Sequence, residues 1–233
     1  QPNFLEGLSF TLDYWEIAIE DAISSVSSQD IVDGCYKEAS LNSAFCSLFT
    51  RNSNSSSMQH GGFNFLHSTN INFANLETSG IDLAIGYDFS IGAHNFGVSV
   101  QGTEVNEIDF YTNPADLSEV NPQLGQILRP ERAGNVYLSW NYGDINVAFQ
   151  SQYLGEMLLG TIEIETADTL YGKKVFMDET WIHNISASYT FSDEITLYGG
   201  IRNLSEEDPF MTEASFPGSP RGRMIFIGGT YRL

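Results

Sequence analysis

Two cysteines are the residues whose type and spacing point most directly to chemistry. Cys35 and Cys46 lie eleven residues apart in a segment rich in Ser, Asn and Asp. Neither belongs to a CxxC pair and no pair of histidines is near them, so a zinc site is disfavoured. We predict a disulfide between them, which implies an oxidising compartment such as the periplasm or the cell surface. The alternative is two unpaired thiols in a cytosolic loop.

The remaining titratable residues form no recognisable catalytic or metal site. Four histidines are scattered without metal-ligand spacing: His60, His67, His94 and His183. Acidic clusters such as 163–168 and 206–208 could hold calcium or bridging cations at a lipopolysaccharide surface. Their spacing matches no calcium loop, so solvated loop charge is the favoured interpretation. We therefore predict no catalytic residues, no metal and no cofactor, and the protein is not expected to be an enzyme.

The charge and hydropathy of the chain narrow the choice of partners. Ten basic against 30 acidic residues give a formal net charge of −20, whereas nucleic-acid binding needs clustered Lys and Arg. No stretch approaches about 18 consecutive apolar residues, which excludes a membrane-spanning helix but not membrane-spanning strands. A mean hydropathy of −0.16 with 13% aromatic residues suits a β-barrel, whose strands alternate apolar and polar residues.

Alternation of apolar and polar residues predicts an antiparallel, all-β fold. The clearest example is Val136, Leu138, Trp140 and Tyr142, which alternate with Asn, Tyr, Ser and Asn. Eight strands are predicted, at 8–19, 64–89, 96–103 with an alternative end at 111, 135–142, 145–153, 181–191, 195–204 and 221–233. The first strand changes phase at Trp15, which indicates a bulge or an exit from one environment into another. The second strand either runs unbroken or breaks near 70–75.

The predicted connections alternate between short and long. Short turns are expected at 90–93, 143–144 and 192–194, and long connections at 21–60, 112–130, 156–178 and 205–220. We expect a short helix, closed by the disulfide, within 27–49. Outer-membrane barrels have short periplasmic turns and long extracellular loops, whereas a soluble sandwich has no reason to separate them. The sequence therefore predicts an antiparallel transmembrane β-barrel.

Aromatic residues gather next to the short turns. They end the apolar faces of the predicted strands, at one level, as an interfacial aromatic girdle requires. The residues predicted to form this membrane girdle are Tyr87, Phe89, Trp140, Tyr142, Tyr189, Phe191 and Tyr231. The alternative is that these aromatic side chains fill the core of an ordinary β-sandwich.

Several stretches resemble the C-terminal portion of the TonB-dependent outer-membrane receptors. The short patterns are individually weak, but they occur in the family's order over nearly the whole chain. They are Leu12–Ile23, Cys35 and Cys46, Thr69–Leu83, Arg129–Arg132, Gly200–Pro209 and Arg221–Arg232. The chain departs from the family at its last residue, which is Leu233 where an aromatic residue is usual.

The resemblance implies a barrel of about 22 strands with an N-terminal plug folded inside it. Residues 1–233 would supply about the last eight strands, the C-terminal part of the barrel. The plug domain and the segment that engages TonB are expected to precede Gln1, since the chain starts without Met or a signal peptide. The implied localisation is the bacterial outer membrane, with outer-membrane lipid and lipopolysaccharide as surroundings.

The implied function is TonB-dependent import of a scarce nutrient, with an imported small ligand, the plug and TonB as partners and no nucleic acid. Family members import iron chelates, cobalamin, sugars and peptides, so the ligand stays open. A disulfide between Cys35 and Cys46 would stiffen the first large outer loop and lower the entropy cost of capturing the ligand. The loop aromatics Tyr36, Phe45 and Tyr171 are the expected ligand contacts.

Two other interpretations remain open from the sequence. One is an independent eight-stranded outer-membrane barrel with a structural or adhesive role, which the number of strands allows. The other is a secreted, soluble β-sandwich that acts as a binding module. The three interpretations differ in whether the sheet closes on itself and in whether its apolar face is covered.

Overall fold

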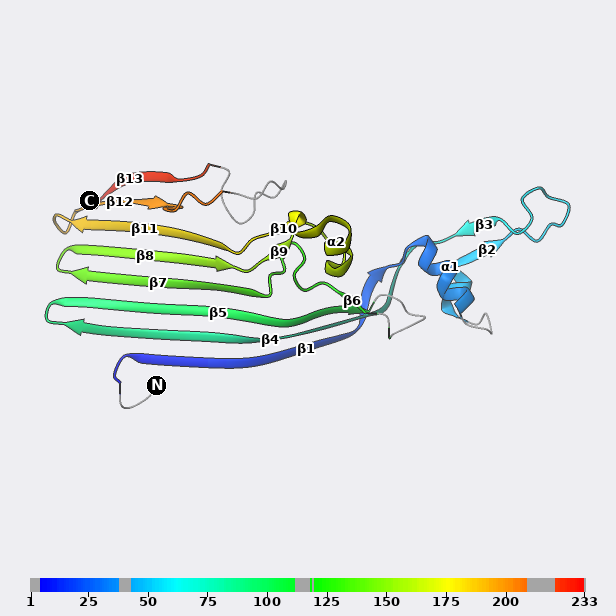
Figure 1. Cartoon of the computed structure of the whole chain (residues 1–233), viewed down its shortest axis with the longest axis horizontal. Helices are drawn as coiled ribbons and strands as arrows, with labels where there is room; N and C mark the ends of the chain where they lie inside the picture. Colours follow the sequence, from blue (N-terminus) through cyan, green and yellow to red (C-terminus); the bar gives the residue numbers. More distant parts are fainter. Residues whose placement is uncertain (1–4, 38–42, 112–117, 119, 209–220, 233) are drawn as a thin grey trace. The chain divides into compact units, whose positions relative to one another are not determined.

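The computed structural model describes residues 5–37, 43–111, 118, 120–208 and 221–232. Its main element is an antiparallel sheet with the strand order β1, β4, β5, β7, β8, β11, β12, β13 (Figure 1). Long strands that follow one another in the chain are therefore neighbours in the sheet. This up-and-down order is typical of a barrel wall, and it confirms the predicted fold class.

All eight predicted strands are present. They are β1 (Leu8–Ser25), β4 (Asn70–Ile91), β5 (His94–Tyr111), β7 (Arg132–Tyr142), β8 (Ile145–Leu154), β11 (Thr180–Thr190), β12 (Ile195–Arg202) and β13 (Met224–Tyr231). The segment predicted as 64–89 is interrupted at 67–69, which separates β3 (Phe63–Leu66) from β4. β3 leaves the main sheet and pairs with β2 (Phe49–Arg51). β1 also extends to Ser25, so the connection expected from residue 21 begins later.

The chain forms two compact units. The first, which we call the wall unit, contains residues 1–15, 79–106 and 123–233. The second, which we call the loop unit, contains residues 16–78 and 107–122. The strands β1, β4 and β5 contribute residues to both units because they are longer than a membrane crossing of about 9–11 residues requires.

The strand register gives the sheet of the wall unit two chemically different faces. Leu138 of β7 pairs with Val98 of β5 and with Phe149 of β8. The next residue along, Tyr137, pairs with Gln150. Because side chains alternate between the faces of a strand, each such pair extends one face across the sheet. One face is therefore apolar and the other polar, as the sequence pattern predicts.

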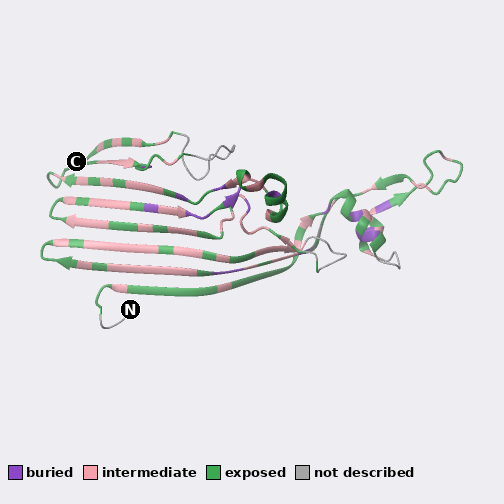
Figure 2. Cartoon of the chain, in the orientation of Figure 1, coloured by how far each residue is buried: buried purple, intermediate pink, exposed green. Residues whose placement is uncertain are grey.

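The apolar face of the wall unit is exposed rather than packed. Ile225 and Ile227 of β13 are 76% and 87% exposed, and Phe10 and Leu12 of β1 are 57% and 60% exposed. Figure 2 shows the long strands coloured mainly as intermediate or exposed. Leaving this surface in water would cost about 25 cal/mol for each Å². The face is suited to lipid, which is the surrounding of a membrane barrel.

The three short turns connect β4 to β5, β7 to β8 and β11 to β12, as predicted. The first two contain Gly92 and Gly143, whose φ angles are +62° and +52°. Glycine adopts this left-handed conformation without steric strain, which lets the chain reverse within two residues. The backbone N–H of Thr190 donates to the carbonyl of Asp144 at 3.0 Å, which ties the second turn to β11.

The loop unit folds around its own small core. The helix α1 (Ser28–Lys37) begins after a capping box, in which Ser27 Oγ lies 2.6 Å from Asp30 Oδ2 and accepts from the Asp30 N–H at 3.1 Å. The Cys35–Cys46 disulfide joins α1 to η1 (Ala44–Leu48). The buried residues of this core are Val26, Ile31, Cys35, Phe45 and Phe49. The predicted disulfide and the predicted short helix are thus both present.

The connection predicted at 156–178 is not structureless. It contains β9 (Met157–Leu158), α2 (Ile164–Tyr171), η2 (Gly172–Val175) and β10 (Phe176–Met177), with β9 and β10 paired. Leu154, Met157 and Met177 form a second buried cluster there. Two-residue strands and an eight-residue helix give too short a periodic signal to be recognised in a sequence. In the other long connections, β6 (Asn121–Pro122) pairs with β5, and residues 209–220 lie outside the described residues.

The sheet argues against both alternative architectures. Its long strands lie in one continuous sheet, so the β-sandwich interpretation is wrong. β1 and β13 end the strand order, and in the described part of the chain each pairs with one neighbour only. The eight strands therefore form an open wall and not a closed eight-stranded barrel. In the same described residues, no helix has the length and apolar character needed to cross a membrane.

A charge on the apolar face should destabilise the protein far more than the same charge on the polar face. Leu138→Arg places a guanidinium near the middle of the wall, where it should cost about 2–4 kcal/mol in a bilayer. The measurement is the free energy of unfolding in lipid vesicles. Gln150→Arg, on the opposite face of the neighbouring strand, is the matched control. Equal losses for the two variants would contradict the assignment of the faces.

Candidate functional site

The polar face of the wall unit carries hydrogen-bonding side chains and little charge. A cavity of about 410 Å³ lies over Tyr137, Gln150, Asn184, Arg202 and Phe226. The guanidinium carbon of Arg202 lies 5.5 Å from the centre of the Phe226 ring. A neighbouring depression of about 400 Å³ is lined by Ser99, Gln101, Asn135, Tyr137 and Gln150. Such a surface can exchange hydrogen bonds with water or with a polar solute.

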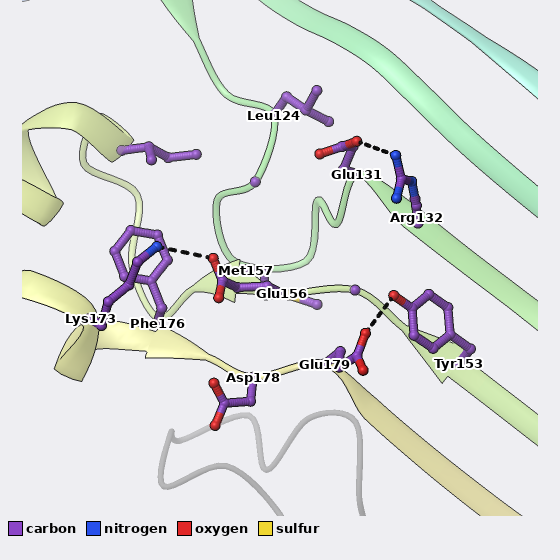
Figure 3. A pocket seen from close by; sticks show the side chains of 13 residues that line it. Leu124, Glu131, Arg132, Tyr153, Glu156, Met157, Lys173, Phe176, Asp178 and Glu179 are labelled. Carbon is purple, nitrogen blue, oxygen red and sulfur yellow. Dashed lines mark hydrogen bonds and ion pairs between the residues drawn. The ribbon is translucent and has the colours of Figure 1, made fainter.

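A second cavity, which we call the loop pocket, lies where β8 and β11 meet the folded connection (Figure 3). Its volume is about 660 Å³. The backbone around it is fixed by two hydrogen bonds, from Leu158 N–H to Gly125 O at 2.7 Å and from Ile127 N–H to Gly160 O at 3.1 Å. The buried Met157 of β9 lines the pocket and pairs with the buried Met177 of β10.

The loop pocket contains carboxylates in excess over cations. Its charged lining residues are Glu131, Glu156, Asp178 and Glu179 against Arg132 and Lys173. Arg132 pairs with Glu131 at 3.2 Å and Lys173 pairs with Glu156 at 3.4 Å (Figure 3). All four side chains of these pairs are at least half exposed, so each pair contributes little and can exchange for other partners. The hydroxyl of Tyr153 donates to Glu179 Oε2 at 3.1 Å.

The three predicted ligand contacts differ in how much surface they offer. Tyr36, at the end of α1, is 50% exposed, and Tyr171, at the end of α2, is 56% exposed. Phe45 is 5% exposed and packs inside the core of the loop unit, which leaves its ring almost no surface for a ligand. None of the three lines the loop pocket. The structure favours Tyr36 and Tyr171 over Phe45, and ligand contact stays a prediction for each.

Arg51 organises an aromatic cluster in the loop unit that the sequence did not reveal. Its guanidinium lies 4.2 Å from the centre of the Phe63 ring and 5.4 Å from that of Tyr36. Its Nε donates to the Tyr36 hydroxyl at 2.7 Å, and its Nη1 donates to Gly61 O at 2.6 Å. These contacts hold the β2–β3 hairpin against α1. The pairing of β2 with β3 brings Arg51 to Phe63, and the core shared by α1 and Phe49 brings it to Tyr36, and neither has a sequence signal.

The structure brings the predicted girdle residues together next to the short turns. The rings of Phe89 and Phe96 stack at 5.0 Å, and those of Tyr189 and Phe191 meet edge-to-face at 4.6 Å. Trp140 Nε1 donates to Nδ1 of His94 at 3.1 Å. His94, which the sequence did not predict as a girdle residue, therefore belongs to the same cluster. Whether the cluster forms the membrane girdle remains a prediction for Tyr87, Phe89, Trp140, Tyr142, Tyr189, Phe191 and Tyr231.

A second aromatic level lies farther along the same face. The rings of Tyr153 and Trp181 are 4.7 Å apart, and Tyr153 pairs with Gly134 of β7. Gly134 lies eight residues before Tyr142, which corresponds to about 26 Å along the strand. With the usual strand tilt of about 35–45°, the two levels would lie about 20 Å apart across the membrane, somewhat less than the usual apolar band of about 25 Å. Neither residue stood out in the sequence, because each lies at a strand end next to a long connection.

Asn203 gives a structural reason for the pattern Gly200–Pro209, one of the stretches that resemble the receptor family. It follows β12 with a φ of +52°, a conformation that asparagine tolerates better than most residues. Its N–H donates to Asn184 Oδ1 at 3.0 Å, and its Oδ1 accepts from the Glu207 N–H at 2.8 Å. Asn203 is 6% exposed. It therefore fixes the exit of the chain from the wall, and its role is structural.

The described histidines and carboxylates are spread over the fold. Among the described residues, no group of three or more His, Cys, Asp or Glu side chains is arranged to hold a metal ion. His183 lies in β11 within the wall, where its ring stacks near Phe149 at 5.7 Å.

An open up-and-down sheet with one face suited to lipid is a segment of an outer-membrane β-barrel wall. Residues 3–204 match the family model described as TonB dependent receptor-like, beta-barrel. The chain belongs to this family, which confirms the resemblance found in the sequence. Its members are receptors of the outer membrane of Gram-negative bacteria, and not enzymes, so the predicted localisation is confirmed.

Solved structures of such receptors share the fold. The ferric enterobactin receptor PfeA of Pseudomonas aeruginosa, solved with enterobactin, is 13% identical, with a TM-score of 0.58 over 97% of this chain and 29% of its own. The pyoverdine receptor FpvA of Pseudomonas aeruginosa is 14% identical, with a TM-score of 0.54 over 97% of this chain and 27% of its own. The ferric-catecholate import receptor Fiu of E. coli K12 is 14% identical, with a TM-score of 0.52 over 97% of this chain and 26% of its own.

The chain thus spans between a quarter and a third of the length of these receptors. No curated protein matches it.

Removing the disulfide should loosen the loop unit without unfolding the wall. Cys46→Ser should cost this unit about 2–4 kcal/mol, because the open chain gains conformational entropy when unfolded. Hydrogen exchange of residues 26–66 measures the loss, and Ser56→Ala in the exposed hairpin loop is the control. Unchanged protection of α1 and β2 in Cys46→Ser would contradict this role.

Asp109 should make the loop unit less stable as the pH rises. Burial raises the pKa of the Asp109 carboxyl above its usual value, and the nearby carboxylates of Glu107 and Glu77 raise it further. Asp109 belongs to the loop unit and follows His94, the first residue of β5, by fifteen residues, which is more than the about 9–11 residues of a membrane-crossing strand. Because the folded carboxyl holds its proton more tightly than the unfolded one, stability falls as pH rises from the unfolded pKa through the folded pKa.

Asp109→Asn should therefore stabilise the outer parts of β4 and β5 at neutral pH and lose this advantage in acid. Hydrogen exchange of 77–78 and 107–111 as a function of pH measures the effect. Glu107→Gln removes one of the carboxylates that raise the pKa of Asp109. In this variant, the loss of stability caused by ionisation of Asp109 should therefore occur at lower pH. A pH profile that is the same in all three proteins would refute the electrostatic explanation.

Proposed function

We propose that residues 1–233 form the C-terminal part of the barrel of a TonB-dependent receptor that imports a scarce nutrient across the outer membrane. The observation that carries the proposal is the match of 3–204 to the receptor barrel family, together with the open, two-faced wall. In this proposal the strands that precede β1 in the complete barrel close the sheet between β1 and β13. A closed barrel leaves no unpaired backbone group in the lipid.

The wall would provide the sealed boundary of the import path. Its polar face, with Tyr137, Gln150, Asn184 and Arg202, would face the lumen and the proposed plug. Neutral hydrogen-bonding groups suit this role, because they solvate a passing ligand without holding it as strongly as fixed charges would. Energy relayed by TonB from the inner membrane would release the plug.

The long connections would capture the ligand outside the membrane. The disulfide and the Arg51 cluster give the loop unit a fixed shape, which lowers the entropy cost of ligand capture. Tyr36 and Tyr171 offer half-exposed aromatic rings to a ligand. The structurally similar receptors are named for ferric enterobactin, pyoverdine and ferric catecholates, so an iron chelate is the first ligand class to test.

Uptake by intact cells tests the proposal. Cells carrying the complete protein should accumulate at least one labelled iron chelate faster than cells lacking it, and a protonophore should abolish the difference. Tyr36→Ala and Tyr171→Ala should weaken ligand binding several-fold while the amount of folded protein is unchanged. Uptake that does not depend on the proton-motive force, or adhesion without uptake of any tested nutrient, would overturn the proposal in favour of a structural or adhesive barrel.

A further inference from the structure

The cavity of about 410 Å³ on the polar face of the wall unit, which we call the wall cavity, lies between two rows of side chains. The row nearer the short turns is small, because Ala148 of β8 pairs with Ser186 of β11 and Ser186 pairs with Gly200 of β12. The next row has long polar side chains, among them the paired Gln150 and Asn184. The rows share one face because alternate residues of a strand point the same way. The small row is therefore the floor of the cavity.

The ring of Phe226 forms one end of the wall cavity. Phe226 of β13 pairs with Gly200, and a Cβ added to this glycine would meet Cζ of Phe226 at 2.8 Å. The ring therefore lies over Gly200, where only a residue without a side chain leaves room for it. A ring fixed in this way offers an apolar surface against which a planar group can stack.

Arg202 provides the charge of the wall cavity. Among the described residues that line it, Arg202 is the only charged one. Its guanidinium carbon lies 5.5 Å from the centre of the Phe226 ring. In the described part of the chain it forms no ion pair, whereas Arg132, Lys173 and Arg223 each pair with a glutamate. A guanidinium keeps its charge and has five N–H donors. Arg202 thus lacks the counter-charge that the other three cations have.

Arg202 lies at the depth of the membrane, on the face turned away from lipid. It is level with Asn184, because their neighbours Ile185 and Ile201 are paired. Asn184 lies in the same row as Tyr137, between the two aromatic levels. A charged residue at this depth is costly unless it faces a water-filled path or a partner, and such residues mark the paths of ligands.

We propose that the wall cavity binds the carboxylate of a planar organic anion, of the class of aromatic carboxylic acids. Arg202 holds the carboxylate with two parallel N–H···O hydrogen bonds. The planar body of the anion rests over Ala148 and Ser186 and against the ring of Phe226, and the amide of Gln150 offers a further donor. The inference rests on the import function proposed above and deepens it, because it names a chemical class of solute that the wall recognises.

The lining of the wall cavity is the reason to choose this class. Its described residues include no carboxylate that would repel an anion. One planar guanidinium neutralises and matches one carboxylate, whereas a doubly charged phosphate would keep a charge without a partner. A neutral sugar would leave Arg202 without a counter-charge. The ring of Phe226 favours a planar hydrocarbon body over a small inorganic anion.

A fluorine NMR titration of the complete protein in detergent tests the site, with para-fluorobenzoate as the probe and para-fluorobenzyl alcohol as its uncharged counterpart. We expect the benzoate to bind about tenfold more tightly than the alcohol, because the alcohol lacks the charge that pairs with Arg202. Arg202→Gln should abolish this preference. Arg223→Gln is the matched control, since it removes an equal charge that pairs with Glu206 outside the cavity, and it should keep the preference.

Heat-modifiable gel migration shows whether each variant is folded. If Arg202→Gln does not fold, photolabelling of the wild-type protein with para-azidobenzoate decides, and adducts are expected at 148–150, 184–186 or 200–202. Equal binding of acid and alcohol would overturn the proposal, and it is the result expected if a carboxylate of the protein itself occupies Arg202. An unchanged preference in Arg202→Gln, or adducts only elsewhere, would also overturn it. Binding is measured without uptake, so failure of the site is distinguished from failure of the proposed import.

Discussion

The exposed apolar face of the sheet is the constraint on which the rest of the structure depends. Strands whose outward side chains are this apolar are stable only beside lipid, and lipid offers no hydrogen bonds to the backbone. Every strand must therefore pair along both edges, which the neighbour-to-neighbour order from β1 to β13 achieves everywhere except at its two ends. The tight glycine turns, the alternating polar face and the aromatic levels all follow from meeting this one requirement.

The sequence predicted the wall well because its signal is local. Alternation with a period of two is repeated along each strand, so β5, β7, β8 and β11 were found close to their observed bounds. The disulfide was also predictable, because only two cysteines are present and they share one segment. The separation of β3 from β4 was not resolved, since apolar residues continue through both strands and the break at 67–69 depends on pairing with β2.

The functional surfaces were harder to predict because they depend on residues that are distant in the sequence. The loop pocket combines residues 124–132 with 153–157 and 164–179, and nothing in any one of these segments indicates a cavity. The second aromatic level needed the register between Gly134, Tyr153 and Trp181. Phe45 shows a different limit, because nothing in the sequence indicates that this loop aromatic packs in a small core. Burial in a short, disulfide-linked unit leaves no periodic signal.

The contact of alternate side chains with lipid tests the central claim most directly. Single cysteines at successive positions of β8, from Asn146 to Gln150, can be labelled with a fluorophore in the protein reconstituted into vesicles. Quenchers attached to the acyl chains should quench labels at 147 and 149, while an aqueous quencher should act on labels at 146, 148 and 150. Quenching that does not alternate, or that alternates in the opposite phase, would show that the apolar face does not lie against lipid.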